Sequence, residues 1–486
     1  MGARIIKLLK WAAALLVVSL ATLLGVRAWD AHRGEPLELW HTYVPHEMRA
    51  QQIAATDWAG YLAAEQRLFE EVRQEVTLKL DAEDRLPGNR FFEGSPIYPG
   101  NFKHDWNRSY VLEPAGAPIG AVVLLHGLTD APYSMRHIAR HYQQRGFVAV
   151  GIRLPGHGTV PGGLTDVEWE AWSQATRLAV REAVRRAGAG KPLHIVGFSN
   201  GGALAMNYAL DALDEPALTK PARIVLLSPM IGVTSLARFA GVLGWPAVLP
   251  SFEKTAWLGI VPEFNPFKYN SFPINGARQS SLLSRHLQQR INQHVRSNGL
   301  ADMPPVLTFQ SVIDFTVSTR AVVDALYQQL PANGSELVLF DLNRSAKFGP
   351  FLRVNPDVTL QRLLPDPPRN YRTGLITNAG PDTREVAERL IEPSSRTELS
   401  RNLGIDYPFE VFSLSHVALP FPLSDSLYGM KPENDEDFGV QLGTLAVRGE
   451  RGALILTLDS LIRMSSNPFY PYMIERIDAG IGGASK

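Results

Sequence analysis

Short apolar runs that alternate with helical segments constrain the fold of this chain more than any other feature of its sequence. Each run has the length of a strand and is almost free of charge, as strands buried on both faces of a parallel sheet must be. The runs cover residues 121–125, 147–152, 193–196, 223–227 and 306–309. Helical segments separate them at residues 133–145, 166–186, 202–213 and 318–330. The alternation predicts an α/β fold, with a mostly parallel sheet and helices on both faces.

Two long stretches interrupt this alternation. Residues 229–303 contain aromatic and Pro-rich pieces, with a polar helix expected around 281–296. Residues 343–406 are rich in Pro, Arg and Asn and separate two late strands expected at 336–342 and 409–414. Because insertions of this size often carry lids and specificity elements, we expect lid-like insertions at these two places.

The rest of the chain is expected to flank an α/β domain at residues 111–430. Residues 29–110 are interpreted as an N-terminal extension that is partly helical, with apolar residues near helical spacing over 57–80. Residues 431–486 are interpreted as a C-terminal extension. Residues 1–28 differ from both in composition and are interpreted as a targeting segment.

That targeting segment contains an apolar run with a positively charged residue at each end. The uncharged run 11–26 follows Lys10 and ends at Arg27. As a helix it covers about 24 Å, against roughly 30 Å of hydrocarbon, and the two flanking cations can snorkel to make up the difference. A signal anchor is therefore expected, with a cleaved signal peptide as the close alternative, since Val26 and Ala28 resemble the small residues of a cleavage site. A buried core helix is a third interpretation. In the first two, the rest of the chain lies on the exported side, membrane-anchored or secreted.

Composition excludes several classes of function. Lys plus Arg and Asp plus Glu each number 48, so the net charge is zero and the electrostatic footprint of a nucleic-acid-binding protein is missing. The chain has no cysteine, which excludes disulfides, thiolate nucleophiles and cysteine metal sites. The sequence implies no metal and no organic cofactor.

The pentapeptide Gly197-Phe198-Ser199-Asn200-Gly201 follows an expected strand and opens an expected helix. This is the setting of a nucleophile elbow, a tight turn that raises a serine hydroxyl above the sheet and needs small neighbours. A Gly-rich turn that binds phosphate is the alternative. It is less favoured, because the GxGxxG spacing and an acidic ribose partner are both missing.

A serine nucleophile needs a base, and in elbows of this kind the chain order is serine, acid, histidine. Of the 12 histidines, only His286, His294 and His416 follow Ser199. The first two lie in the polar helix of the first insertion, before any late acid. His416 is therefore the expected base.

Asp314 is the expected acid, because it comes just after the expected strand at 306–310. Its role would be to hold the imidazole tautomer and stabilise the imidazolium. Asp341, at the end of the next expected strand, is the main competitor. Asp302 precedes the strand and fits poorly.

Two backbone N–H groups are expected to form an oxyanion hole. One belongs to Asn200, the residue after the nucleophile, and the other to Leu128 in the loop that begins at His126. Gly127 allows the close backbone approach. His126 comes too early in the chain to be the base and is interpreted as shaping the loop, and Asp130 as a helix cap.

These motifs together resemble the carboxylesterase and monoacylglycerol-lipase branch of the α/β-hydrolase superfamily, a branch of serine hydrolases. The resemblance rests on LLHGLTD at 124–130, RLPGHGTVPGGLTDVEWEAW at 153–172 and GFSNGG at 197–202, and extends to Asp314 with Val317 and to Ser415-His416-Val417. It covers residues 110–330 and 405–425. It implies a Ser199, Asp314 and His416 triad, and an oxyanion hole from Leu128 and Asn200. Three segments depart from the family: the N-terminal hundred residues, the stretch between Asp314 and His416, and the tail after Gly429. The polar residue Asn200 also departs from it, because family members frequently have a bulky apolar residue at this position.

The expected function is hydrolysis of carboxylic esters, with a small-molecule or lipid ester as substrate and a membrane contact through the N-terminal segment. Thioester and amide hydrolysis need the same residues and stay open as alternatives. A non-enzymatic binding protein with this fold is a further alternative and is less favoured. Apolar residues of the first insertion are expected either to cap a lipid-accepting pocket or to pack in an ordinary way. These are Phe239, Leu243, Trp245, Leu249, Phe252 and Trp257.

Overall fold

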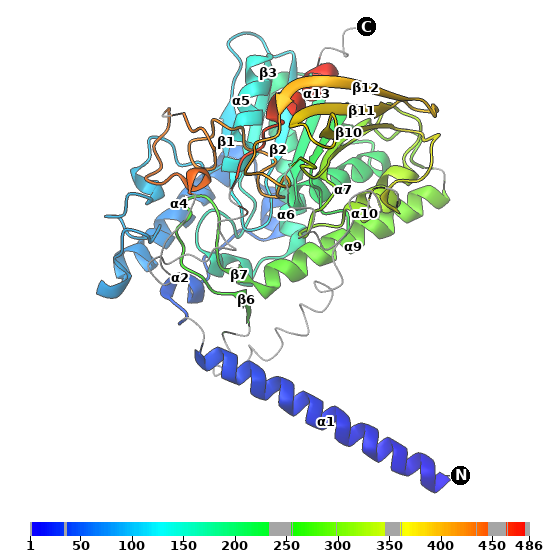
Figure 1. Cartoon of the computed structure of the whole chain (residues 1–486). Coiled ribbons are helices and arrows are strands. Elements are labelled where there is room, and N and C mark those ends of the chain that lie inside the picture. Colours follow the sequence, from blue (N-terminus) through cyan, green and yellow to red (C-terminus); the bar gives the residue numbers. More distant parts are fainter. Residues whose placement is uncertain are drawn as a thin grey trace.

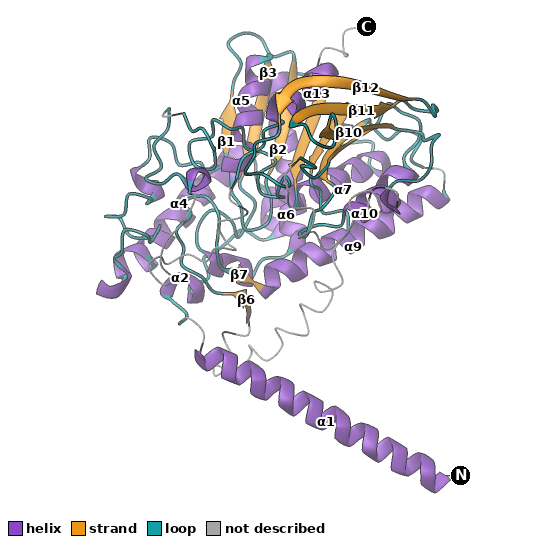
Figure 2. Cartoon of the chain, viewed as in Figure 1, coloured by secondary structure: helices purple, strands orange, loops and turns teal. Residues whose placement is uncertain are grey.

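A ten-stranded sheet organises the chain in the computed structural model (Figures 1 and 2). The structure describes residues 2–33, 36–232, 254, 256–297, 299–345, 360, 362–433, 435–445, 463 and 465–481. The strand order is β1-β3-β2-β4-β5-β8-β9-β10-β11-β12. The pairs from β3 through β10 are parallel, whereas β1 at one edge and β11 and β12 at the other are antiparallel. The predicted α/β-hydrolase fold with a mostly parallel sheet is confirmed.

The expected central strands form close to their predicted bounds. They are β2 (Gly120–Leu125), β3 (Phe147–Ile152), β4 (Leu193–Phe198), β5 (Arg223–Leu227), β8 (Val306–Ser311) and β9 (Glu336–Phe340), and β1 (Tyr110–Leu112) joins the edge next to β3. Along β2, Val123 and Leu125 belong to one core and Val122 and Leu124 to the other. Burial on both faces explains why these strands are apolar throughout and could be recognised in the sequence.

Helices form a layer on each face of the sheet (Figure 2). The core that contains Val123 includes residues of α3 (Ala50–Ala55), α6 (Trp169–Ala187), α7 (Asn200–Asp214) and α9 (Ile274–Arg296). The opposite core includes residues of α5 (Arg136–Gln144) and α13 (Tyr470–Ile481), so the C-terminal segment completes this layer. The segment expected as a helix at 318–330 is divided into three short helical turns, which begin with α10 (Thr319–Ala321).

The late strand predicted at 409–414 is wrong. That segment forms turns, and Phe409 and Phe412 are exposed rather than buried in a sheet. The sheet is instead extended from within residues 343–406, by β10 (Arg372–Asn378), β11 (Glu385–Ile391) and β12 (Glu398–Asp406). β12 is the edge strand and is almost wholly solvent-facing, and β11 beside it carries three charged residues, so both lack the apolar signature of the central strands.

The targeting segment is helical, as α1 (Gly2–Arg33). Among the helices that the structure describes, none is long and apolar enough to cross a membrane. The predicted signal anchor and its membrane contact are therefore not supported. The signal-peptide alternative and the exported location stay predictions.

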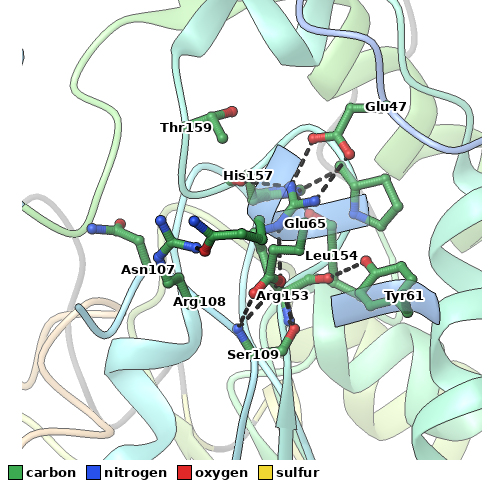
Figure 3. A network of polar contacts seen from close by, with 12 residues as sticks. Glu47, Tyr61, Glu65, Asn107, Arg108, Ser109, Arg153, Leu154, His157 and Thr159 are labelled. Atoms are coloured by element: carbon green, nitrogen blue, oxygen red, sulfur yellow. Dashed lines mark hydrogen bonds and ion pairs between the residues drawn. The ribbon is translucent and has the colours of Figure 1, made fainter. Parts of the chain in front are cut away.

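A buried ion-pair network fastens the N-terminal extension to the loop after β3 (Figure 3). Arg153 lies directly after β3, and its guanidinium contacts both carboxylate oxygens of Glu47, at 2.7 and 3.0 Å. It also contacts Glu65 of α4 (Trp58–Glu75) at 3.2 Å. Glu47 in turn accepts a hydrogen bond from the backbone N–H of Gly156 at 2.7 Å. The three charged side chains are almost fully enclosed, so each charge depends on the others for compensation.

Replacing Arg153 with methionine should therefore destabilise the fold strongly. Arg153→Met leaves two buried carboxylates without their cation, and removing one partner of a buried pair costs about 3–5 kcal/mol. Chemical denaturation followed by circular dichroism should show the loss as a lower midpoint. In the exposed Arg49–Asp166 pair, Arg49→Met should change the free energy of unfolding by less than about 1 kcal/mol. Equal effects of the two variants would contradict the role assigned to the network.

Candidate active site

The candidate nucleophile occupies a strained turn between β4 and α7. Ser199 has φ 53° and ψ −113°, a positive φ that non-glycine residues rarely adopt. Its backbone N–H donates to the Leu227 carbonyl at 2.9 Å, and its carbonyl accepts from the Met230 N–H at 2.9 Å. These bonds to the end of β5 and the segment after it hold the turn in its unusual conformation.

The two flanking glycines are required by the close approach of backbone segments. A Cβ atom added at Gly201 would lie 2.1 Å from the Leu125 carbonyl oxygen at the end of β2. One added at Gly197 would lie 2.4 Å from the carbonyl oxygen of Gly201. Neither contact can be relieved by moving a side chain, since both partners are backbone atoms. The pattern Gly-x-Ser-x-Gly thus follows from packing of the turn against β2 at Gly201 and against the start of α7 at Gly197.

Asp314 and His416, which are 102 positions apart in the chain, are in direct contact. His416 Nδ1 lies 2.9 Å from Asp314 Oδ2. The other carboxylate oxygen accepts the backbone N–H groups of Thr316 and Val317, at 2.7 and 3.0 Å. Burial alone would raise the pKa of Asp314, but the charge and hydrogen bond of His416 and these two N–H groups lower it overall. A carboxylate held in its charged form can orient the imidazole and stabilise an imidazolium.

The other candidate residues lie elsewhere. Asp341 pairs with Arg344 at 2.8 Å, and its carboxylate also accepts a hydrogen bond from Thr377. Asp302 is largely exposed and pairs with Lys220. Neither of these aspartates contacts His416 in the part of the chain that the structure describes. The two earlier histidines are both on α9, where His286 packs against Trp169 and His294 contacts Asp214.

The expected oxyanion residues lie on either side of Ser199. Leu128 lines the same cavity as Ser199, and a Cβ atom added at Gly127 would lie 3.3 Å from the Ser199 Cβ. Asn200 is the first residue of α7 and is fully buried. Its side-chain oxygen accepts from Ser280 of α9 at 2.9 Å, so the side chain is directed toward that helix.

His126 fixes the loop that carries Leu128. Its Nε2 accepts the backbone N–H of Leu154 at 3.1 Å, which leaves the proton on Nδ1 to be donated to the Gly127 carbonyl at 2.9 Å. Burial holds the pKa of His126 well below its usual value, so the ring is neutral at pH 7. Leu154 is next to Arg153, so the buried ion-pair network and the loop of Leu128 are joined by one hydrogen bond.

Ser199 and His416 line a common cavity of about 500 Å³, and the His416 ring packs on Phe198 at 5.2 Å between centroids. The first insertion contributes Val261, Phe264, Lys268, Tyr269, Asn270 and Phe272 to its wall. Of the residues expected to cap a pocket, Trp257 is buried against His41 and does not line the cavity. The other five, Phe239, Leu243, Trp245, Leu249 and Phe252, lie outside the described residues.

Sequence reasoning missed several polar residues of this wall, among them two cations and a tyrosine. Lys268 lies in the insertion, and Tyr428 and Arg463 come from the region after His416. No motif marks them, because only the tertiary fold brings them to the cavity. Within the described residues, no group of three or more His, Asp or Glu side chains could hold a metal ion.

The fold and the residues around Ser199 define the class of protein as a hydrolase with the α/β-hydrolase fold. A family model described as serine aminopeptidase, S33, matches residues 116–341. The thermostable monoacylglycerol lipase of Bacillus sp. (strain H-257) is 30% identical over 222 residues, which make up 46% of this chain and 80% of the lipase. The chain belongs to the α/β-hydrolase family, in its monoacylglycerol-lipase-like branch, and is an enzyme of the lipase and esterase kind.

Solved structures resemble the chain over about half of its length. One, from work on the metagenome-derived lipolytic enzymes LipS and LipT, is 20% identical, covers 49% of this chain and 88% of its own, and has a TM-score of 0.39. A soluble variant of monoglyceride lipase from Saccharomyces cerevisiae is 15% identical, covers 48% and 81%, and has a TM-score of 0.37. Since both TM-scores are below 0.5, neither likeness supports a conclusion about the site.

Gly201→Ala should disrupt the turn of Ser199. Its Cβ would meet the Leu125 carbonyl at 2.1 Å, and forced overpacking of this kind typically costs about 1–3 kcal/mol, occasionally more. We expect a lower melting temperature and a loss of ester hydrolysis. At Gly116, where an added Cβ meets nothing within 4 Å, Gly116→Ala should leave both properties near the parent values. A Gly201→Ala protein with parental stability and activity would contradict the packing described for the turn.

Proposed function

We propose that the chain hydrolyses carboxylic esters through a Ser199, His416 and Asp314 triad and a covalent acyl-enzyme intermediate. The observation that carries the proposal is the 2.9 Å contact between His416 and Asp314, in the wall of the cavity that also contains Ser199. The order of these residues along the chain is the order of the nucleophile-elbow hydrolases. Membership of the lipase-like branch supports an ester as the substrate.

In this mechanism, Ser199 Oγ attacks the ester carbonyl while His416 takes its proton. The contact between Asp314 and Nδ1 leaves Nε2 of His416 as the nitrogen that exchanges the proton with the serine and then with the leaving alcohol. Water, activated by the same histidine, releases the acid from Ser199 in the second half of the reaction. The N–H groups of Leu128 and Asn200 would stabilise the tetrahedral oxyanion, at about 2.7–4 kcal/mol per donor.

Two observations favour an ester with an apolar portion. The cavity wall includes Leu128, Met230, Phe264 and Phe272, which suit an acyl chain. The bacterial relative carries the name monoacylglycerol lipase. A lipid or other apolar ester is therefore the proposed substrate. Peptide or amide hydrolysis is the second candidate, because the family model is described as serine aminopeptidase and the same residues would serve. A set of p-nitrophenyl esters of graded chain length, compared with aminoacyl amides, separates the two.

Ser199→Ala should abolish labelling by a fluorophosphonate probe, because such probes react with an activated serine hydroxyl. Hydrolysis of p-nitrophenyl butyrate should fall by about 10⁴-fold or more. Gel fluorescence and absorbance at 400 nm are the two measurements. The matched variant Ser297→Ala, at an exposed serine after α9, should keep both activities. Folded parent protein that takes up no probe would contradict the enzymatic proposal.

Asp314→Asn should lower kcat by about 10⁴-fold with little change in KM, since it removes the charge that holds and stabilises the His416 ring. Steady-state kinetics on the same ester measures the effect. Asp302→Asn changes an exposed aspartate and should remain near the parent kcat. Should Asp341→Asn lose activity while folded Asp314→Asn keeps it, Asp341 would be the acid instead.

A further inference from the structure

Two cationic side chains face the cavity that contains Ser199. Lys268 comes from the first insertion and Arg463 from the C-terminal region, and both line the cavity wall. No Asp or Glu is among the described residues that line it. The two cations are near enough for the charge of Arg463 to lower the pKa of Lys268. The two positive charges repel each other, and an anion bound between them would offset this repulsion.

The Lys268 ammonium is not neutralised by a close contact. It forms no hydrogen bond and no ion pair within 4 Å with any residue that the structure describes. Burial lowers its pKa, and the one carboxylate that opposes this shift belongs to Asp130, which lies on the loop after Leu128. Asp130 is itself buried, and its Oδ2 has no hydrogen-bond partner. Asp130 is thus the carboxylate that partly offsets the charge of Lys268, without contacting it.

Arg463 is held in place by two residues close in sequence to Asp314 and His416. Its guanidinium donates to Thr316 Oγ1 at 2.5 Å, and its carbonyl accepts from Ser415 Oγ at 3.0 Å. Thr316 follows Asp314 by two positions and Ser415 precedes His416. No other acceptor for the guanidinium of Arg463 is found among the described residues, and its fork geometry suits carboxylate and phosphate.

We propose that Lys268 and Arg463 form an anion subsite, so that the preferred substrates are esters bearing a carboxylate or phosphate group a few bonds from the scissile carbonyl. The inference rests on the proposed function, since it places the ester carbonyl at Ser199. The apolar wall of the same cavity receives the uncharged part of the substrate. The ligand is therefore an amphiphilic anionic ester rather than a neutral one.

Paired substrates that differ by one anionic group test the subsite. The first pair is p-nitrophenyl hexanoate and mono-p-nitrophenyl adipate, which place the anion in the acyl part. The second is monobutyrylglycerol and its 3-phosphate, which place it in the alcohol. We expect kcat/KM to be higher for the anionic member of at least one pair, and the pair that responds identifies the source of the anion.

The variant Lys268→Gln should lower kcat/KM for the preferred anionic ester by about ten-fold or more, as expected for loss of a charge-assisted contact, and leave the neutral partner nearly unchanged. Arg463→Gln should act in the same direction. Lys191→Gln, at an exposed lysine before β4, is the matched control and should change neither substrate. Circular dichroism and fluorophosphonate labelling establish that each variant is folded and that Ser199 is reactive.

Three outcomes overturn the subsite. The first is a parent protein that prefers the neutral member of both pairs. The second is a Lys268→Gln variant that lowers kcat/KM equally for both members of a pair. The third is a Lys191→Gln variant that acts as strongly as Lys268→Gln. In each case neutral esters are still cleaved and the probe still labels the protein, so the proposed function survives. If the parent protein hydrolyses no ester and takes up no probe, the proposed function is overturned, and the subsite with it.

Discussion

The contact between the Ser199 turn and the end of β2 is the constraint on which the site depends. At Gly201 the backbone approaches the Leu125 carbonyl so closely that no side chain fits. This approach places the turn beside the loop of Leu128, because that loop begins where β2 ends. Parallel strands present their carboxyl ends at one edge, so β8 delivers Asp314 to the same edge. The sheet architecture thus brings together the turn of Ser199, the proposed acid Asp314 and the loop of Leu128.

The segments outside the family domain support this arrangement. Glu47 and Glu65 of the N-terminal extension neutralise Arg153, which lies beside Leu154, and Leu154 donates to His126 in the oxyanion loop. At the other end of the chain, α13 packs on the sheet, and Arg463 contacts the neighbours of both Asp314 and His416. The extensions therefore contact the segments that carry the proposed catalytic residues.

Physical reasons decide which parts could be predicted from the sequence. The central strands could be predicted because burial on both faces requires apolar runs in the sequence. The turn of Ser199 could be predicted because packing requires a glycine on each side of it. The strand β11 contains several charged residues and the edge strand β12 is solvent-facing, so their sequences predict an insertion and no strands. Lys268 and Arg463 reach the cavity through tertiary folding alone, which leaves no local pattern. The order of Asp314 and His416 along the chain suggests that they are partners, but the distance between them follows from the tertiary fold alone.

The central claim is that Ser199 carries an acyl group during the reaction, and measuring the mass of the protein during turnover tests it most directly. Rapid acid quenching of the reaction with p-nitrophenyl acetate, followed by intact mass spectrometry and peptide mapping, measures whether an acyl group is bound and where. The account predicts the mass increase of one acetyl group per chain, on the peptide that contains Ser199 and on that residue. Steady hydrolysis with no covalent species at any time, or an acyl group on a different residue that Ser199→Ala does not remove, would contradict it.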